Sequence, residues 1–175
     1  MKNKQTSPHP DKKKINVRDT AILGVAAALC LVLSYIEFLL PPVYAALPAV
    51  KFGLANVTVV FALYRLGVWR ATALAAVKVA LTALLFGSLV SMAYSAAGAA
   101  LSLAAMALLK KTGKFSSVGV SVVGGVAHNV GQILTAVAFF GIPEIAYYLP
   151  VLIVSGTLSG IFIGACGGIA VKRVK

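Results

Sequence analysis

Acidic residues are scarce in this 175-residue sequence, which holds four of them against sixteen Lys and Arg. Asp11 and Asp19 precede the apolar body of the chain, so only Glu37 and Glu144 remain for chemistry inside it. Enzymes that hold magnesium through clustered carboxylates need more acidic side chains than these two. The composition therefore excludes most enzymes of that kind, and we expect no metal and no cofactor.

Cysteine is similarly rare. Cys30 and Cys166 are the only two, and each lies within an apolar run. Two such thiols can build neither a disulfide framework nor a metal cluster. We expect both to behave as small buried hydrophobes.

Charge of either sign is low overall, because 11% of the residues are charged and 60% are hydrophobic. A soluble globular domain has about 25% charged and about 45–50% apolar residues. The net charge of +12 could suggest nucleic acid binding, but the basic residues fall in short clusters between long apolar runs. We therefore predict an all-α integral membrane protein that contacts the lipid bilayer and no nucleic acid.

The apolar runs set the number of helices, since a membrane-spanning helix needs about 20 residues. A basic segment, 1–18, is expected to be a disordered cytoplasmic tail, and 19–175 to form one transmembrane domain. A proline-broken apolar segment, 43–50, is expected to act as a lid-like connection. The six predicted helices, of which the second is short, cover residues 20–40, 51–64, 71–86, 89–109, 117–140 and 148–171.

Basic residues predict the orientation. Fourteen of the sixteen Lys and Arg, all but Lys51 and Lys78, lie in the tail, near 65–70, near 110–114 or at the C-terminus. With six helices these four clusters fall on one side of the membrane. The positive-inside rule then places both termini in the cytoplasm, in the plasma membrane of a prokaryote.

Small residues at four-residue spacing predict close helix contacts. The sixth helix carries such a stripe, which we expect to pack within the bundle, with a homodimer seam as the alternative. The first helix carries a shorter version, Gly24 and Ala28. The residues of the stripe are Gly156, Gly160, Gly164 and Gly168.

Two stretches carry a resemblance to a known family. One is D-T-A-I-L-G-V-A-A-A-L-C-L-V-L-S-Y-I-E at 19–37, and the other is K-F-G-L-A-N at 51–56, after a proline-bearing loop. Together with the helix count, they resemble the substrate-binding S components of energy-coupling factor (ECF) vitamin transporters. More narrowly, the second stretch resembles the Gx transporter group, often labelled heptaprenyl diphosphate synthase component I.

The resemblance implies a division of labour. S components bind a small molecule from outside, while a separate transmembrane T component and two ATPase subunits drive its release. The chain has no G-x-x-x-x-G-K-[ST] phosphate loop, so ATP hydrolysis must come from such partners. In the family, small residues on the first helix dock the T component, which places that role on Gly24 and Ala28. The first of these positions is usually Ala in the family.

Other functions remain open. Prenyl diphosphate synthases bind magnesium through aspartate-rich motifs, and no D-D-x-x-D run is present. The chain could therefore be at most a non-catalytic subunit of such a synthase. A membrane accessory of flavin-linked extracellular electron transfer is the other alternative.

Polar residues inside apolar helices are costly on lipid and often mark function. Each candidate has a structural alternative. Lys78 could snorkel toward the cytoplasmic surface or pair inside the bundle, and the polar face of the fifth helix could be a hydrogen-bond clamp. Tyr94 could anchor at the interface, and Asn56 could be packing glue. Glu37 is expected at a solvated rim. The predicted substrate-binding residues are Lys51, Asn56, Lys78, Tyr94, His128, Asn129 and Gln132.

The sequence predicts the position of the ligand site more closely than the identity of the ligand. We place its site in the outer half of the bundle, between the third, fourth, fifth and sixth helices. Lys51, Lys78 and His128 favour an anionic or carbonyl-rich molecule. Composition does not choose between a vitamin, a flavin and an isoprenoid precursor.

Overall fold

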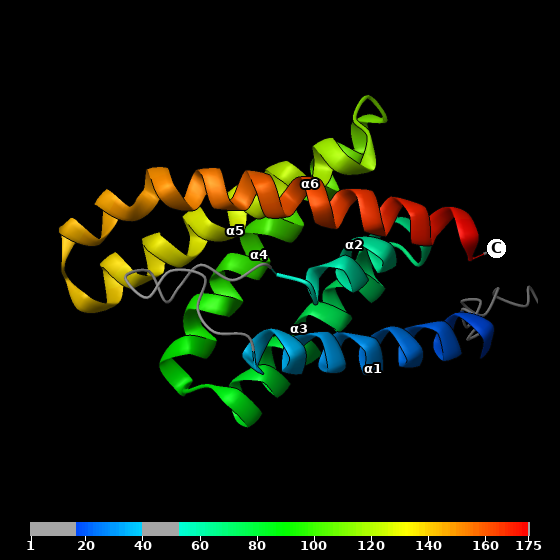
Figure 1. The fold of residues 1–175 in the computed structure, drawn as a ribbon, viewed down its shortest axis with the longest axis horizontal. Coiled ribbons are helices and arrows are strands. Elements are labelled where there is room, and N and C mark those ends of the chain that lie inside the picture. The colour runs from blue at the N-terminus through cyan, green and yellow to red at the C-terminus, as the bar shows by residue number, and fades with distance from the viewer. Residues whose placement is uncertain (1–16, 40–52, 175) are drawn as a thin grey trace, which may run out of the picture.

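The computed structural model of the chain describes residues 17–39 and 53–174. Within these ranges the chain forms six α-helices and one short 3-10 helix (Figure 1). The prediction of an all-α six-helix protein is confirmed. The elements are α1 (Val17–Leu39), α2 (Asn56–Arg65), α3 (Val68–Phe86), α4 (Leu89–Thr112), α5 (Ser117–Phe140), η1 (Pro143–Tyr148) and α6 (Leu149–Arg173).

Five helical segments are long and apolar enough to cross a membrane. These are α1, α3, α4, α5 and the combined segment of η1 and α6. The remaining helix, α2, has ten residues. It is about 15 Å long, half of a hydrocarbon core of about 30 Å, so it cannot cross alone.

Some boundaries differ from the predicted ones. We expected the second helix to begin at residue 51, but residues 54 and 55 form a turn and Asn56 is the first residue of α2. Val17 and Arg18 already belong to α1, although we assigned them to the tail. Residues 1–16 and the predicted lid, 43–50, lie outside the described residues.

Local sequence signals explain where the long helices begin and end. Ser88 starts α4 with a capping box, in which the Ser91 backbone N–H donates to the Ser88 hydroxyl at 3.2 Å. Gly113 ends α4 and Gly141 ends α5, each with a left-handed backbone, at φ values of 68° and 67°. Glycine takes this conformation without the steric cost that a Cβ would add.

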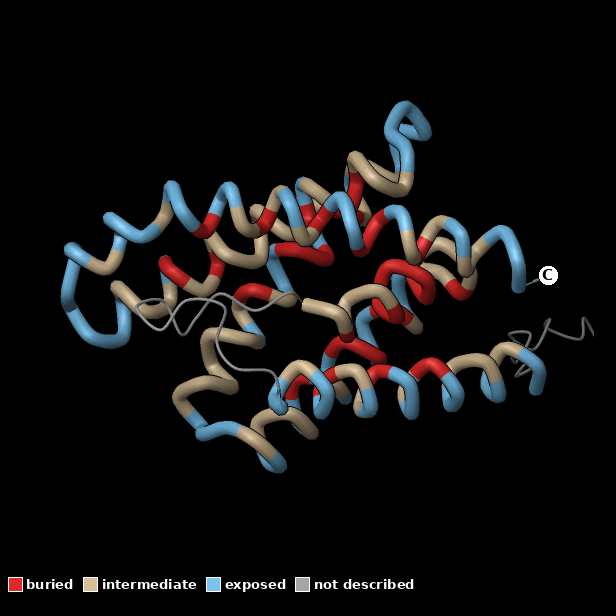
Figure 2. Tube along the Cα trace, in the orientation of Figure 1, coloured by how far each residue is buried: buried red, intermediate tan, exposed pale blue. Residues whose placement is uncertain are grey.

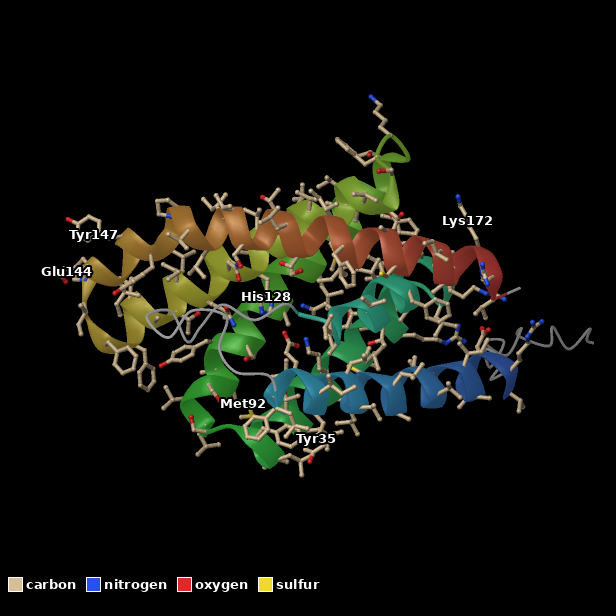
Figure 3. All side chains as sticks on the ribbon, in the orientation of Figure 1. Tyr35, Met92, His128, Glu144, Tyr147 and Lys172 are labelled. Atoms are coloured by element: carbon tan, nitrogen blue, oxygen red, sulfur yellow. The ribbon has the colours of Figure 1, made fainter. Side chains whose placement is uncertain are left out.

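The basic clusters meet at one end of the bundle. Asp19 at the start of α1 accepts from Arg70 of α3 at 2.7 Å. Lys110 near the end of α4 donates to the Leu63 carbonyl of α2 at 2.5 Å. Lys172 lies at this same end in Figure 3, far from Glu144 and Tyr147. Arg70, Lys110 and Lys172 thus lie at one end of the bundle, as the charge pattern predicts for one membrane face, whereas Lys78 lies within the bundle.

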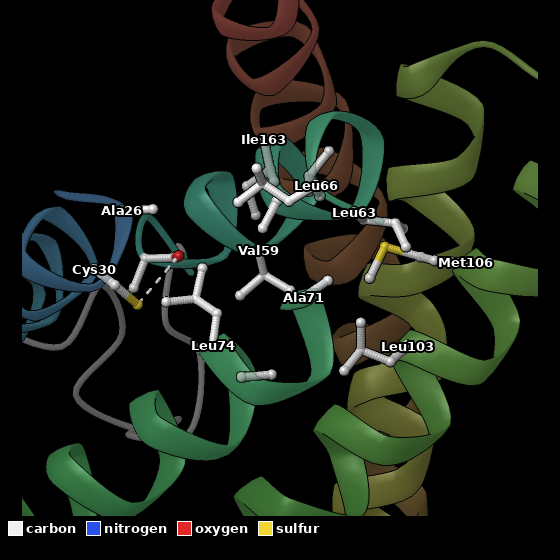
Figure 4. Packing of buried hydrophobic residues seen from close by; sticks show 14 of the residues in the cluster. Ala26, Cys30, Val59, Leu63, Leu66, Ala71, Leu74, Leu103, Met106 and Ile163 are labelled. Carbon is white, nitrogen blue, oxygen red and sulfur yellow. Dashed lines mark hydrogen bonds between the residues drawn. The ribbon is translucent and has the colours of Figure 1, made fainter. Parts of the chain in front are cut away.

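Among the described helices, α2 is the best buried, as Figure 2 shows by its colour. Its residues Val60 and Leu63 are almost completely buried, and they belong to one apolar cluster with Leu74 of α3 (Figure 4). Cys30 of α1 joins this cluster and donates to the Ala55 carbonyl at 3.7 Å. Cys30 is thus buried as expected, whereas Cys166 is half-buried.

The glycine stripe of α6 packs against α5 of the same chain. A Cβ added at Gly160 would lie 2.6 Å from the Val122 Cα atom, and one added at Gly164 would lie 2.6 Å from the Val118 Cα atom. Real Cβ atoms do not approach backbone so closely, so the two helices touch only because these side chains are missing. The other two stripe residues also face α5 closely; they are Gly156 and Gly168.

Candidate functional site

A cavity of about 610 Å³ lies among the helices in the half of the bundle that is remote from the basic end. Drug-sized ligands occupy cavities of about 300–1,000 Å³. All six predicted binding residues within the described ranges line it, whereas Lys51 lies outside those ranges. The six are Asn56, Lys78, Tyr94, His128, Asn129 and Gln132.

Lys78 points into the bundle. Its ammonium group donates to the Asn56 side-chain oxygen at 2.5 Å, which links the middle of α3 to the first turn of α2. A charged side chain on lipid costs at least about 2.5–3.5 kcal/mol, so this inward placement beside a polar partner explains how the bundle accommodates the charge. Of the two structural alternatives for Lys78, pairing inside the bundle describes this geometry, and snorkelling toward the membrane surface does not.

The polar face of α5 divides into two parts. The Asn129 side-chain amide donates to the Leu152 carbonyl of α6 at 2.6 Å, so Asn129 acts as the interhelical clamp that we gave as its alternative role. The Gln132 amide has no hydrogen-bond partner among residues 17–39 and 53–174. His128 lies near the centre of the bundle in Figure 3, where its backbone and ring pack against Gly98 of α4.

This division gives a testable difference between two variants. Asn129→Leu is expected to lower stability by about 1 kcal/mol, because it removes a membrane interhelical hydrogen bond and crowds Gly156. Gln132→Leu should leave stability unchanged within about 0.5 kcal/mol, as substitutions away from such bonds usually do. Thermal unfolding in detergent measures both, with Gln132→Leu as the matched control. Equal melting temperatures for the two variants would contradict the clamp.

Glu37 is placed differently from our expectation of a solvated rim. Its carboxylate accepts a hydrogen bond from the Gly53 backbone N–H, and it lines the cavity. Gly53 has φ of +69°, which favours glycine. The K-F-G-L-A-N motif thus supplies both Gly53, which binds Glu37, and Asn56, which binds Lys78. The sequence signal that could have predicted this contact is a carboxylate, Glu37, at the end of the helix that precedes the motif.

Aromatic side chains surround the mouth of the cavity. Phe38 of α1 stacks on Phe86 of α3 with ring centroids 4.9 Å apart. Tyr94 of α4 lies 6.3 Å from the ring of Phe140 of α5. Phe38, Phe86 and Tyr94 all line the cavity, so its outer part offers flat apolar surfaces. Sequence reasoning identified Tyr94 but missed the two phenylalanines.

The predicted docking residues lie on the outer face of α1. Gly24 and Ala28 are exposed, and a Cβ added at Gly24 would meet nothing within 4 Å. This face is therefore available to another helix. Among the described residues, no group of three or more His, Cys, Asp or Glu is placed to hold a metal ion.

Apolar helices of spanning length around a ligand-sized cavity define a multi-pass helical membrane protein. The family model for heptaprenyl diphosphate synthase component I matches residues 26–169, and the chain belongs to this family. The narrower of the two predicted resemblances is thereby confirmed, and the wider one is consistent with it. No curated protein and no solved structure matches the chain significantly.

Proposed function

We propose that this chain is the substrate-binding S component of an ECF-type transporter, which takes up a small organic, vitamin-like molecule across the plasma membrane. The observation that carries the proposal is the 610 Å³ cavity, which is lined by six of the predicted binding residues from four helices. Ligand sites combine apolar walls with a few placed polar groups. A cavity of this size would lower the packing density of a bundle that served only as a scaffold, whereas protein interiors are normally close-packed.

The exposed small-residue face of α1 supports the transporter role further. A partner helix can approach Gly24 and Ala28 closely, as the T component does in the S components that the sequence resembles. The basic end supports an orientation with both termini cytoplasmic. The cavity would then open toward the outside, where an uptake protein must collect its substrate.

The family description favours a second candidate, a non-catalytic membrane subunit of a prenyl diphosphate synthase. Such a subunit would hold a soluble prenyltransferase rather than a T component. An accessory of flavin-linked electron transfer is a further alternative, which would associate with redox partners. The three candidates therefore differ in their partners.

Co-purification from native membranes tests the proposal. A tagged chain should retain a T component and two ATPase subunits in stoichiometric amounts, as measured by quantitative mass spectrometry. Recovery of a soluble prenyltransferase, without ATPases, would instead support the synthase subunit and overturn the transporter.

Native mass spectrometry of the purified chain tests the cavity. The wild type should retain a small molecule, and Ala136→Trp, which fills the cavity, should lose it. Leu134→Trp is the matched control, because Leu134 lies on the same helix and is 61% exposed away from the bundle. Equal retention by Ala136→Trp and the wild type would contradict the assignment of the cavity as the binding site.

A further inference from the structure

A second, smaller cavity adjoins the large one. It has a volume of about 80 Å³ and shares Asn56, Lys78, Ser95 and His128 with the large cavity. On α4 the large cavity reaches from Ser91 to Ser95, and the small one continues from Ser95 to Met106. The small cavity is therefore a recess that extends from the large one toward the basic end of the bundle.

Three serine hydroxyls line this recess without a hydrogen-bond partner among the described residues: Ser95, Ser102 and Ser121. Ser102 is 8% exposed and Ser121 is 3% exposed. Thr82, which also lines the recess, differs from them because its hydroxyl donates to the Lys78 carbonyl at 2.7 Å in the usual helical manner.

The hydroxyl oxygens of these three serines are open to the recess and are not sealed within the packing, although Ser102 and Ser121 are buried residues and Ser95 is half-buried. A group that enters the recess can therefore accept three hydrogen bonds from them. Water could do so in part, but the charge of the lining adds a requirement. Lys78 is the one formally charged residue among the described residues of the recess, and its charge is positive.

The size of the recess limits the group. About 10–15 Å³ of such cavity space is enough to admit one water molecule, so 80 Å³ has room for a few waters or one compact polar group. That room suits the head group of a ligand and not its body. The large cavity, with Phe38, Phe86 and Tyr94 at its mouth, suits a flat apolar body.

We propose that the recess binds a compact oxyanion group, a carboxylate or a phosphate, at one end of a flat organic substrate. Lys78 supplies the compensating charge, and Ser95, Ser102 and Ser121 donate hydrogen bonds. This inference rests on the proposed function in taking the large cavity as a substrate site. It adds the chemical class of the substrate and the direction in which it lies, with its acid group toward the basic end.

Three probes that share one aromatic body test the proposal on the purified full-length protein in detergent. They are 2-naphthoate, 2-naphthamide and 2-naphthyl phosphate, titrated by isothermal calorimetry. Charged hydrogen bonds are worth about 1.5–3 kcal/mol, so at least one anionic probe should bind about tenfold more tightly than the neutral amide. The stronger of the two anions identifies the head group. Equal or tighter binding of 2-naphthamide than of both anions would overturn the proposal.

Variants locate the effect. Lys78→Met should bring the anions to within about twofold of the amide, and Ser121→Ala, which preserves the Lys78–Asn56 contact, should weaken the anions alone by about threefold. Lys114→Met, at an exposed turn beyond α4, is the matched charge control and should retain the preference. An anion preference that survives in both Lys78→Met and Ser121→Ala would refute the recess.

The outcomes of the two proposals are separable. If the ATPase partners are absent from the co-purified material but the anion preference is intact, the transporter function is refuted and the oxyanion site stands. If those partners are retained but no anion preference is found, the oxyanion site is refuted and the transporter function stands.

Discussion

Gly160→Leu should prevent stable folding of the protein. A Cβ at this position would lie 2.6 Å from Val122 Cα and 2.8 Å from the Ser121 carbonyl, and backbone cannot turn aside as a flexible side chain can. Overpacking a core usually costs about 1–3 kcal/mol. Because a whole leucine would here separate α5 from α6, we expect a loss of at least about 3 kcal/mol, seen as a lower melting temperature and aggregation on size-exclusion chromatography.

The matched control is Gly24→Leu, which makes the same chemical change in the middle of a helix. No atom lies within 4 Å of a Cβ at Gly24, so this variant should elute and melt like the wild type. If Gly160→Leu behaved like Gly24→Leu, the close approach of α5 and α6 would be wrong. The glycine stripe would then be available for the homodimer seam that the sequence left as an alternative.

Gly24→Trp and Ala28→Trp should abolish assembly with the transmembrane partner. Both positions are exposed on α1, and an indole at either one would keep a partner helix from approaching its backbone. In a pull-down from membranes, we expect recovery of the partner to fall by at least about tenfold, which corresponds to a loss of about 1.4 kcal/mol.

The solitary variants should still fold and retain their small molecule, because neither position lines the cavity. Leu158→Trp controls for bulk on a lipid-facing surface, since Leu158 of α6 is 65% exposed. Undiminished recovery of the partner by both α1 variants would show that docking uses another face. Leu158→Trp, by contrast, should recover the partner as well as the wild type does.

Helix positions followed from the sequence wherever an apolar run was closed by a strong local signal. Both predicted ends of the fifth helix, 117 and 140, coincide with those of α5, because Ser116 caps its start and Gly141 ends it. The start of α2 could not be predicted in this way. Residues 51–55 resemble the helix after them in apolar character, and the contact of Gly53 with Glu37 beside the turn at 54–55 joins two segments that are far apart in the sequence.

Part of the candidate site could be predicted from the sequence for a similar reason. Lys78, His128 and Gln132 are conspicuous because polar groups are rare in apolar helices. Ser102 and Ser121 are not conspicuous, because serine commonly binds its own helix backbone in membrane proteins. The packing of α4 against α5 brings both serines to one recess, which is the basis of their proposed role, and sequence spacing within one helix carries no information about its neighbour.

The two acidic contacts of α1 have a mechanical consequence. Asp19 joins the first turn of α1 to α3, and Glu37 joins its last turn to the segment that leads into α2. The helix is therefore pinned at both tips, while its middle contributes small buried groups such as Ala26 and Cys30. A displacement of α1 would therefore load these two contacts together with the contacts that Cys30 and Phe38 make. Since α2 and α3 carry Asn56 and Lys78, such a displacement would bear on two residues of the cavity wall.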